Sequence, residues 1–191
     1  MTNSADIYYP IGETEKLIIK SIWRLHECNI QERTETILPK GTVEIIFNLS
    51  DDIIYCNSFM SIKRKLPPCF INGINYKPFK LIKSGQQIFL GIQLNTLGLK
   101  VLLNESVKEF NNNILEGSQV CKTLDTLSHQ LIYKKLFNEQ VQTIINWINQ
   151  RISSSKCVKE LNQVNNLFFS QSVNTLTVKK LSSQMYLSDS A

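Results

Sequence analysis

Histidine is scarce in this sequence: its 191 residues include only two, His26 and His129. A metal site in a β-barrel needs several histidine and carboxylate ligands that converge on one ion. The sequence also lacks His-x-His, His-Glu-x-x-His, Gly-x-Ser-x-Gly and glycine-rich phosphate-binding motifs. A mechanism that uses only carboxylates, such as Glu27 and Glu44, remains open, but no motif marks one. We therefore expect a protein that is not an enzyme, with no catalytic residues, no metal and no cofactor.

Paired cysteines and long apolar runs are missing as well. The five cysteines are scattered, and none forms a Cys-x-x-Cys pair, a pattern that favours free thiols in a reducing cytosol. No apolar run approaches the roughly 18 residues of a membrane-spanning helix. The first residues lack the basic and apolar regions of a secretory signal. These absences predict a cytoplasmic protein that does not enter a membrane.

The N-terminal half has the alternating apolar pattern of short β-strands, separated by glycine, proline and aspartate turns. The basic stretch Lys63–Pro68 between two of them could contact phosphate, but we favour a solvated loop. Such strands predict an antiparallel barrel or sandwich, which could enclose one small ligand. The expected strands are Lys16–His26, Glu32–Leu38, Thr42–Leu49, Ile53–Cys56, Cys69–Ile74, Phe79–Lys83 and Gln87–Leu94.

Three residues of these strands are candidates for ligand binding: Trp23, Glu44 and Phe47. Glu44 is either an exposed strand carboxylate, which we favour, or a polar anchor inside a pocket. Trp23 is more typical of a core residue, although an aromatic wall is also a common ligand surface. Alternation places Phe47 with Val43 and Ile45 on one face of its strand and Glu44 on the other.

The C-terminal half has helical periodicity. Short helices are expected after Asn95 and Ser106, and longer amphipathic ones follow over residues 118–131, 141–152 and 158–168. The apolar residues of the first long helix recur at 4-3-4 spacing, which is typical both of a dimer seam and of a core face. Net charge rises along the chain, from +1 over residues 1–117 to +4 over residues 118–191. Excess positive charge suits a segment that leads to a polyanion.

The last 18 residues have the pattern of a helix, a corner and the start of a second helix. Thr177 is a suitable N-cap, and an apolar stripe at i, i+3 and i+7 follows it. Ser188 is a second N-cap candidate, and Asp189 favours the first turn of a new helix. This order is typical of a helix-turn-helix motif, and we expect the sequence to end where its DNA-reading helix begins.

Two parts of the chain resemble AraC-type transcriptional regulators. Residues 176–188 are similar to the first helix and turn of the family's DNA-binding domain, with Ser182 in place of the usual alanine and Tyr186 in place of the frequent turn glycine. The N-terminal similarity covers residues 16–116 and rests on Leu38–Leu49, Ile71–Gly73, Leu90–Leu94 and Gly98–Leu99. The family's N-terminal domain has the same Pro-x-Gly and Glu-hydrophobic-hydrophobic-Phe-Asn pattern.

The resemblance implies an α+β fold with a cupin-like half-barrel followed by a helical part. It implies three regions: residues 1–117 as an effector-binding domain, 118–172 as a helical dimerisation or linker region, and 173–191 as the start of the DNA-binding domain. Thr177, Ser188, Asp189 and Ser190 would then belong to an incomplete DNA-binding motif. The implied partners are promoter DNA for the intact protein, a small-molecule effector and a second copy of the chain. The alternative is a stand-alone ligand-binding β-barrel without a DNA role.

Overall fold

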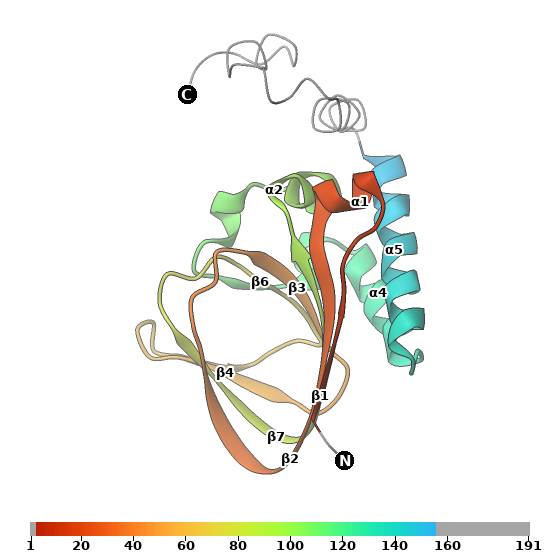
Figure 1. The fold of residues 1–191 in the computed structure, drawn as a ribbon. Coiled ribbons are helices and arrows are strands. Elements are labelled where there is room, and N and C mark those ends of the chain that lie inside the picture. The colour runs from red at the N-terminus through yellow and green to blue at the C-terminus, as the bar shows by residue number, and fades with distance from the viewer. Residues whose placement is uncertain (1–2, 156–191) are drawn as a thin grey trace.

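The computed structural model describes residues 3–155, which form an antiparallel β-sheet with helices packed on one side (Figure 1). The expected helix over residues 158–168 and the candidate DNA-binding residues Thr177, Ser188, Asp189 and Ser190 lie outside the described residues. Within residues 3–155, no helix combines the length and the apolar character needed to cross a membrane.

Eight strands form one sheet in the order β1-β2-β7-β3-β6-β8, with β4 on the first part of β7 and β5 on β4. Every strand pair is antiparallel. The sheet is strongly curved but does not close. The expected α+β class is confirmed in its half-barrel form. The strands are β1 Ser4–Tyr8, β2 Ile19–Ile37, β3 Val43–Asn48, β4 Ile53–Asn57, β5 Ile62–Lys65, β6 Cys69–Asn72, β7 Phe79–Leu94 and β8 Ile114–Glu116.

Two long strands replace four of the expected short ones. The segments 16–26 and 32–38 fall largely within β2, and the segments 79–83 and 87–94 are the two parts of β7. The expectation of separate strands was wrong because β2 and β7 pair with each other along their whole length, with irregularities between Ile19 and Ser21 and between Asn29 and Arg33. Gly85 has a φ of 69°, which glycine adopts at little steric cost, and it marks a bend rather than a strand end.

Two smaller expectations are also corrected. Residues 16–18, expected in a strand, belong to helix α1 (Glu13–Ile18), whose first turn carries Glu13 and Glu15, a favourable charge at a helix N-terminus. The stretch 63–65, expected in a loop, lies in β5, an exposed edge strand that pairs only with β4. Lysine and arginine on an edge strand hinder pairing with another chain.

The helical part packs against the face of the sheet formed by β3, β6 and the second half of β7. Its buried leucines and isoleucines share one hydrophobic cluster with Val43, Ile45 and Phe47 of β3. Leu124, Leu127 and Leu131 are at most 1% exposed, so the 4-3-4 stripe is a core face. The elements are α2 Thr96–Gly98, π-helix η1 Leu99–Leu103, 3₁₀-helix η2 Val107–Phe110, α3 Gly117–Val120, α4 Thr123–Ile132 and α5 Phe137–Ser154.

A second hydrophobic cluster lies on the other face of the sheet. There Ile46 and Phe70 meet Ile53 and Tyr55 of β4 and Phe79 of the first half of β7. Because β2 and β7 curve, their two halves face each other across this cluster (Figure 1). The same strand β3 therefore contributes to the helix-covered core with one face and to the interior of the half-barrel with the other.

Candidate functional site

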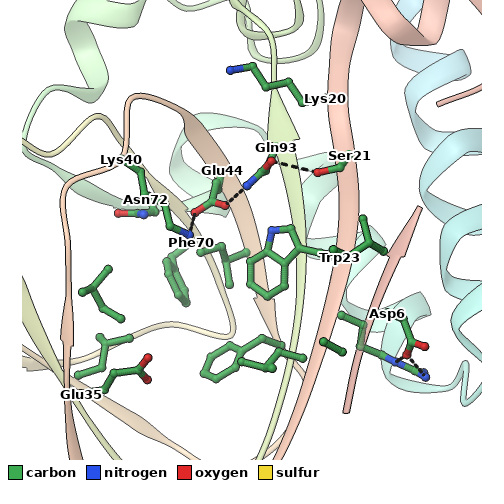
Figure 2. A pocket seen from close by; sticks show the side chains of 18 of the residues that line it. Asp6, Lys20, Ser21, Trp23, Glu35, Lys40, Glu44, Phe70, Asn72 and Gln93 are labelled. Atoms are coloured by element: carbon green, nitrogen blue, oxygen red, sulfur yellow. Dashed lines mark hydrogen bonds and ion pairs between the residues drawn. The ribbon is translucent and has the colours of Figure 1, made fainter. Parts of the chain in front are cut away.

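The interior of the half-barrel contains a cavity of about 480 Å³ (Figure 2). This volume is within the range of about 300–1,000 Å³ typical of small-molecule sites. The walls come from both halves of the sheet and from β1. The lining residues are Ala5, Asp6, Ile7, Tyr9, Lys20, Ser21, Trp23, Arg24, Leu25, Glu35, Ile37, Lys40, Glu44, Ile46, Phe70, Asn72, Phe79, Leu81, Lys83, Phe89 and Gln93.

A polar row crosses four neighbouring strands at one end of the cavity. Ser21 of β2 pairs with Gln93 of β7, Gln93 pairs with Glu44 of β3, and Glu44 pairs with Asn72 of β6. Residues paired in register lie on the same face of a sheet. Four polar side chains from distant parts of the sequence therefore point into the cavity side by side.

Hydrogen bonds connect this row. Ser21 Oγ donates to Gln93 Oε1 at 3.0 Å, and Gln93 Nε2 donates to Glu44 Oε1 at 2.9 Å. Lys40 Nζ lies 3.5 Å from Glu44 Oε2, and Figure 2 shows Glu44 between Lys40 and Gln93. Glu44 is only 1% exposed, so the favoured expectation of an exposed strand carboxylate was wrong. A carboxylate at this depth needs donors around it, because an unpaired buried charge is very unfavourable.

The next row along the strands is apolar. Trp23 pairs with Gly91, which also pairs with Ile46, and Ile46 pairs with Phe70. A Cβ atom added to Gly91 would lie 2.2 Å from Trp23 Cε2 and 2.5 Å from Trp23 Nε1. The indole ring therefore lies across Gly91, a close approach that no other residue type would permit. Trp23 forms part of the cavity wall as a result.

A second charged group lies at the other end of the cavity. Lys83, 3% exposed, forms ion pairs with Glu35 and with Glu27 Oε2, the latter at 3.0 Å. Arg33 Nη2 holds the other oxygen of Glu27 at 2.8 Å. Burial opposes ionisation of Glu27, but the hydrogen bonds and charges of Lys83 and Arg33 outweigh it and lower the pKa of this carboxyl below its usual value.

The structure brings two of the three expected ligand-binding residues together. Trp23 and Glu44 both line the cavity, on adjacent rows. Phe47 does not: it is fully buried on the opposite face of β3, within the cluster that contacts the helices. Its place follows from strand alternation, since positions three apart face opposite sides.

Sequence reasoning missed Gln93, Asn72 and Lys83. Gln93 and Asn72 are polar residues at cavity-facing positions of otherwise apolar strands, and this is a signal that the sequence carries. Lys83 carries no such signal, because its partner Glu27 is 56 positions away. In the described residues, no three His, Cys, Asp or Glu side chains are grouped so that they could hold a metal ion.

Cys69 differs chemically from the more accessible cysteines Cys28 and Cys56. It belongs to β6 and is buried in the hydrophobic cluster that the sheet shares with the helices. Burial, followed by the negative charges of Asp125, Cys121 and Glu116, raises the pKa of its thiol to about 12. Only the thiolate reacts with alkylating agents. We expect iodoacetamide at pH 8 to label Cys69 of the folded protein more than about 100-fold more slowly than Cys28 or Cys56.

Peptide mass spectrometry over a time course measures these rates. The same reaction in 8 M urea is the control, in which the three cysteines should react at similar rates. Equal labelling of Cys69 in the folded protein would contradict the assigned burial.

The family of the chain follows from its sequence over this part of the fold. Residues 16–116 match the model of a family described as Domain of unknown function (DUF6597). The match spans α1 to β8 and more than half of the chain. The chain belongs to the DUF6597 family. Domains of this family are associated with AraC-type regulators, which confirms the resemblance inferred from the sequence. No curated protein matches the sequence.

Several solved structures show a limited likeness to the DUF6597 chain. ToxT from Vibrio cholerae is 7% identical, with 99% of this chain and 73% of ToxT covered and a TM-score of 0.41. The AraC-like transcriptional activator CuxR is 10% identical, with 96% and 76% covered and a TM-score of 0.40. A Cupin_2 domain of an XRE family transcriptional regulator from Enterobacter cloacae is 14% identical, with 49% and 96% covered and a TM-score of 0.34.

Proposed function

We propose that this DUF6597 chain is the effector-sensing part of an AraC-type transcriptional regulator, which acts in the cytoplasm and binds promoter DNA when intact. The observation that carries the proposal is the cavity of about 480 Å³ with its polar row and its aromatic wall. Because these side chains hold no catalytic motif, the domain would bind a small molecule without converting it. The association of the family with AraC-type regulators supports a regulatory use of that binding.

The path from the cavity to the helices supports a sensing role. β3 faces the cavity with Glu44 and Ile46, and it faces the helix-covered core with Ile45 and Phe47. Arg24 of β2 adds a polar link: its Nη1 donates to Lys135 O at 3.1 Å and to Gln140 Oε1 of α5 at 3.4 Å. A change in strand position on ligand binding would therefore reach α4 and α5 directly.

A cavity-filling variant tests the proposal. Ile46→Trp places a large side chain in the middle of the cavity, whereas Ile132→Trp makes the same change at a half-exposed position of α4. A ligand at 100 times its Kd stabilises the folded state by about 2.7 kcal/mol. In a thermal-shift screen of sugars, aromatic compounds and metabolite extracts, we expect a compound that stabilises wild type and Ile132→Trp but not Ile46→Trp.

The complete reading frame provides the second part of this test. We expect the intact regulator to bind its promoter DNA in a gel-shift assay, and the compound to change that affinity in wild type but not in Ile46→Trp. An intact gene product without a DNA-binding region would contradict the proposal and favour the stand-alone ligand-binding protein. A DNA affinity that no compound alters in wild type would contradict the sensing role.

A further inference from the structure

The chemistry of the cavity changes along its length, and this change describes the ligand. One end has the polar row of Ser21, Gln93, Glu44 and Asn72. The middle is apolar and largely aromatic, with side chains from both halves of the sheet: Trp23, Leu25, Ile37, Ile46, Phe70, Phe79, Leu81 and Phe89. A matching ligand has an apolar, ring-bearing body and one polar end.

The strongest hydrogen-bond acceptor at the polar end is the buried carboxylate of Glu44. A carboxylate has room for about four hydrogen bonds, and Glu44 receives one from Gln93 at 2.9 Å and a long contact from Lys40 at 3.5 Å. Lys40 itself is half exposed, so solvent screens its charge. Glu44 therefore retains acceptor capacity at a buried position on the cavity wall, and a ligand group that donates a hydrogen bond satisfies it.

The other charges argue against an anionic ligand, and the two lysines at the polar end, Lys40 beside Glu44 and Lys20 at the border, would repel a cationic one. Lys83 is held by Glu27 and Glu35, and Arg24 is held by Asp6 at 2.7 Å. Lys20 is exposed at the border of the cavity, where Figure 2 shows it above Gln93. A ligand anion placed against the aromatic wall would thus find no unpaired buried cation among the lining residues, and burial of an unpaired charge is very unfavourable.

We propose that the ligand is a neutral, ring-bearing alcohol of the phenol type, whose hydroxyl group donates to Glu44 and whose ring lies against Trp23. This rests on the proposed sensing function and names the ligand class of the same cavity. Glu44 lies in the polar row with Ser21, and Trp23 lies in the next row with Ile46. The two rows are two residues apart along each strand. The hydroxyl group and the ring of one molecule can therefore reach both residues.

Four biphenyl probes that differ only at one end test this assignment by titration calorimetry on the full 191-residue chain. They are 4-phenylphenol, its methyl ether 4-methoxybiphenyl, biphenyl-4-carboxylate and 4-phenylbenzylammonium. The ether keeps the oxygen but cannot donate. We expect 4-phenylphenol to bind at least about 10-fold more tightly than each of the other three, because only it donates a hydrogen bond without bringing a charge.

Glu44→Gln removes the charge of the acceptor and keeps its shape, and Glu32→Gln is the matched change at an exposed position of β2. The measured quantity is the ratio of the affinity for 4-phenylphenol to the affinity for its methyl ether. We expect this ratio to fall below about 3-fold in Glu44→Gln and to stay unchanged in Glu32→Gln. The reason is that a hydrogen bond to an ionised group is about twice as strong as a neutral one. The folded fraction of a variant is the same in both titrations, so it cancels from the ratio. The ratio therefore does not depend on the stability of the variant.

Tighter binding of the carboxylate or of the ammonium, equal binding of phenol and ether, or an unchanged ratio in Glu44→Gln would overturn the assignment. So would the absence of binding by all four probes up to about 1 mM. The sensing function is judged separately: a compound from the screen that stabilises wild type but not Ile46→Trp would leave it standing, with a ligand of another class.

Discussion

Replacement of Lys83 by methionine is expected to lower the free energy of unfolding by about 3 kcal/mol. Removal of one partner from a buried ion pair costs about 3–5 kcal/mol, because the remaining charge stays buried without compensation. Lys83 is 3% exposed and contacts both Glu27 and Glu35. The lower end of the range applies because Arg33 still holds one oxygen of Glu27 at 2.8 Å.

Urea unfolding of Lys83→Met and of Lys80→Met measures this loss. Lys80 is an exposed residue of the same strand, so its substitution should change the free energy of unfolding by less than about 0.5 kcal/mol. A Lys83→Met variant as stable as Lys80→Met would show that the ion pairs contribute nothing net to folding.

The pH dependence of the same variant has a definite sign. The lowered pKa of Glu27 stabilises the folded state above the ordinary glutamate value of 4.5, and this contribution disappears as pH falls through the folded pKa. The difference between wild type and Lys83→Met should therefore be largest near neutral pH and shrink below pH 4.5. A difference that is constant from pH 7 to pH 3 would assign the loss to packing rather than charge.

Local periodicity was sufficient to predict β3 and its two faces. The alternation from Val43 to Asn48 placed Glu44 and Phe47 on opposite sides, as the structure does. The same pattern failed at the beginning of β2, where residues 16–18 have an alternating sequence but form the end of α1. Ile18 is fully buried, and a Cβ atom added to Gly98 would lie 2.1 Å from Ile18 O, so tertiary packing overrides the local pattern there.

Long-range register limited the prediction of the site. Glu44 and Trp23 could be named as candidates, each from its own strand. Their combination with Gln93 and Asn72 depends on which strands pair and in what register, and neighbouring residues do not encode this information. Gly91 illustrates the same limit: the sequence shows a glycine within an apolar strand, and only the fold shows that Trp23 lies across it.

A larger side chain at Gly91 is therefore expected to weaken ligand binding strongly. In Gly91→Val, the new side chain would occupy the position of the Trp23 indole, which a Cβ atom alone would approach to 2.2 Å. The ring must move into the cavity, and we expect the affinity for 4-phenylphenol to fall at least about 30-fold, the equivalent of about 2 kcal/mol. The free energy of unfolding should fall by about 1–3 kcal/mol, the usual cost of overpacking.

Two comparisons isolate the contact between Gly91 and Trp23 as the cause. A Cβ atom added to Gly41 meets no atom within 4 Å, so Gly41→Val should leave binding and stability nearly unchanged. In the double variant Trp23→Ala with Gly91→Val, the added side chain has room. The loss of unfolding free energy in the double variant should therefore be about 1–2 kcal/mol smaller than the sum of the losses in the two single variants. A coupling of this size is typical of residues in direct contact. Strict additivity in this cycle would mean that the indole does not lie across Gly91, and the aromatic wall of the cavity would then have to be assigned to other residues.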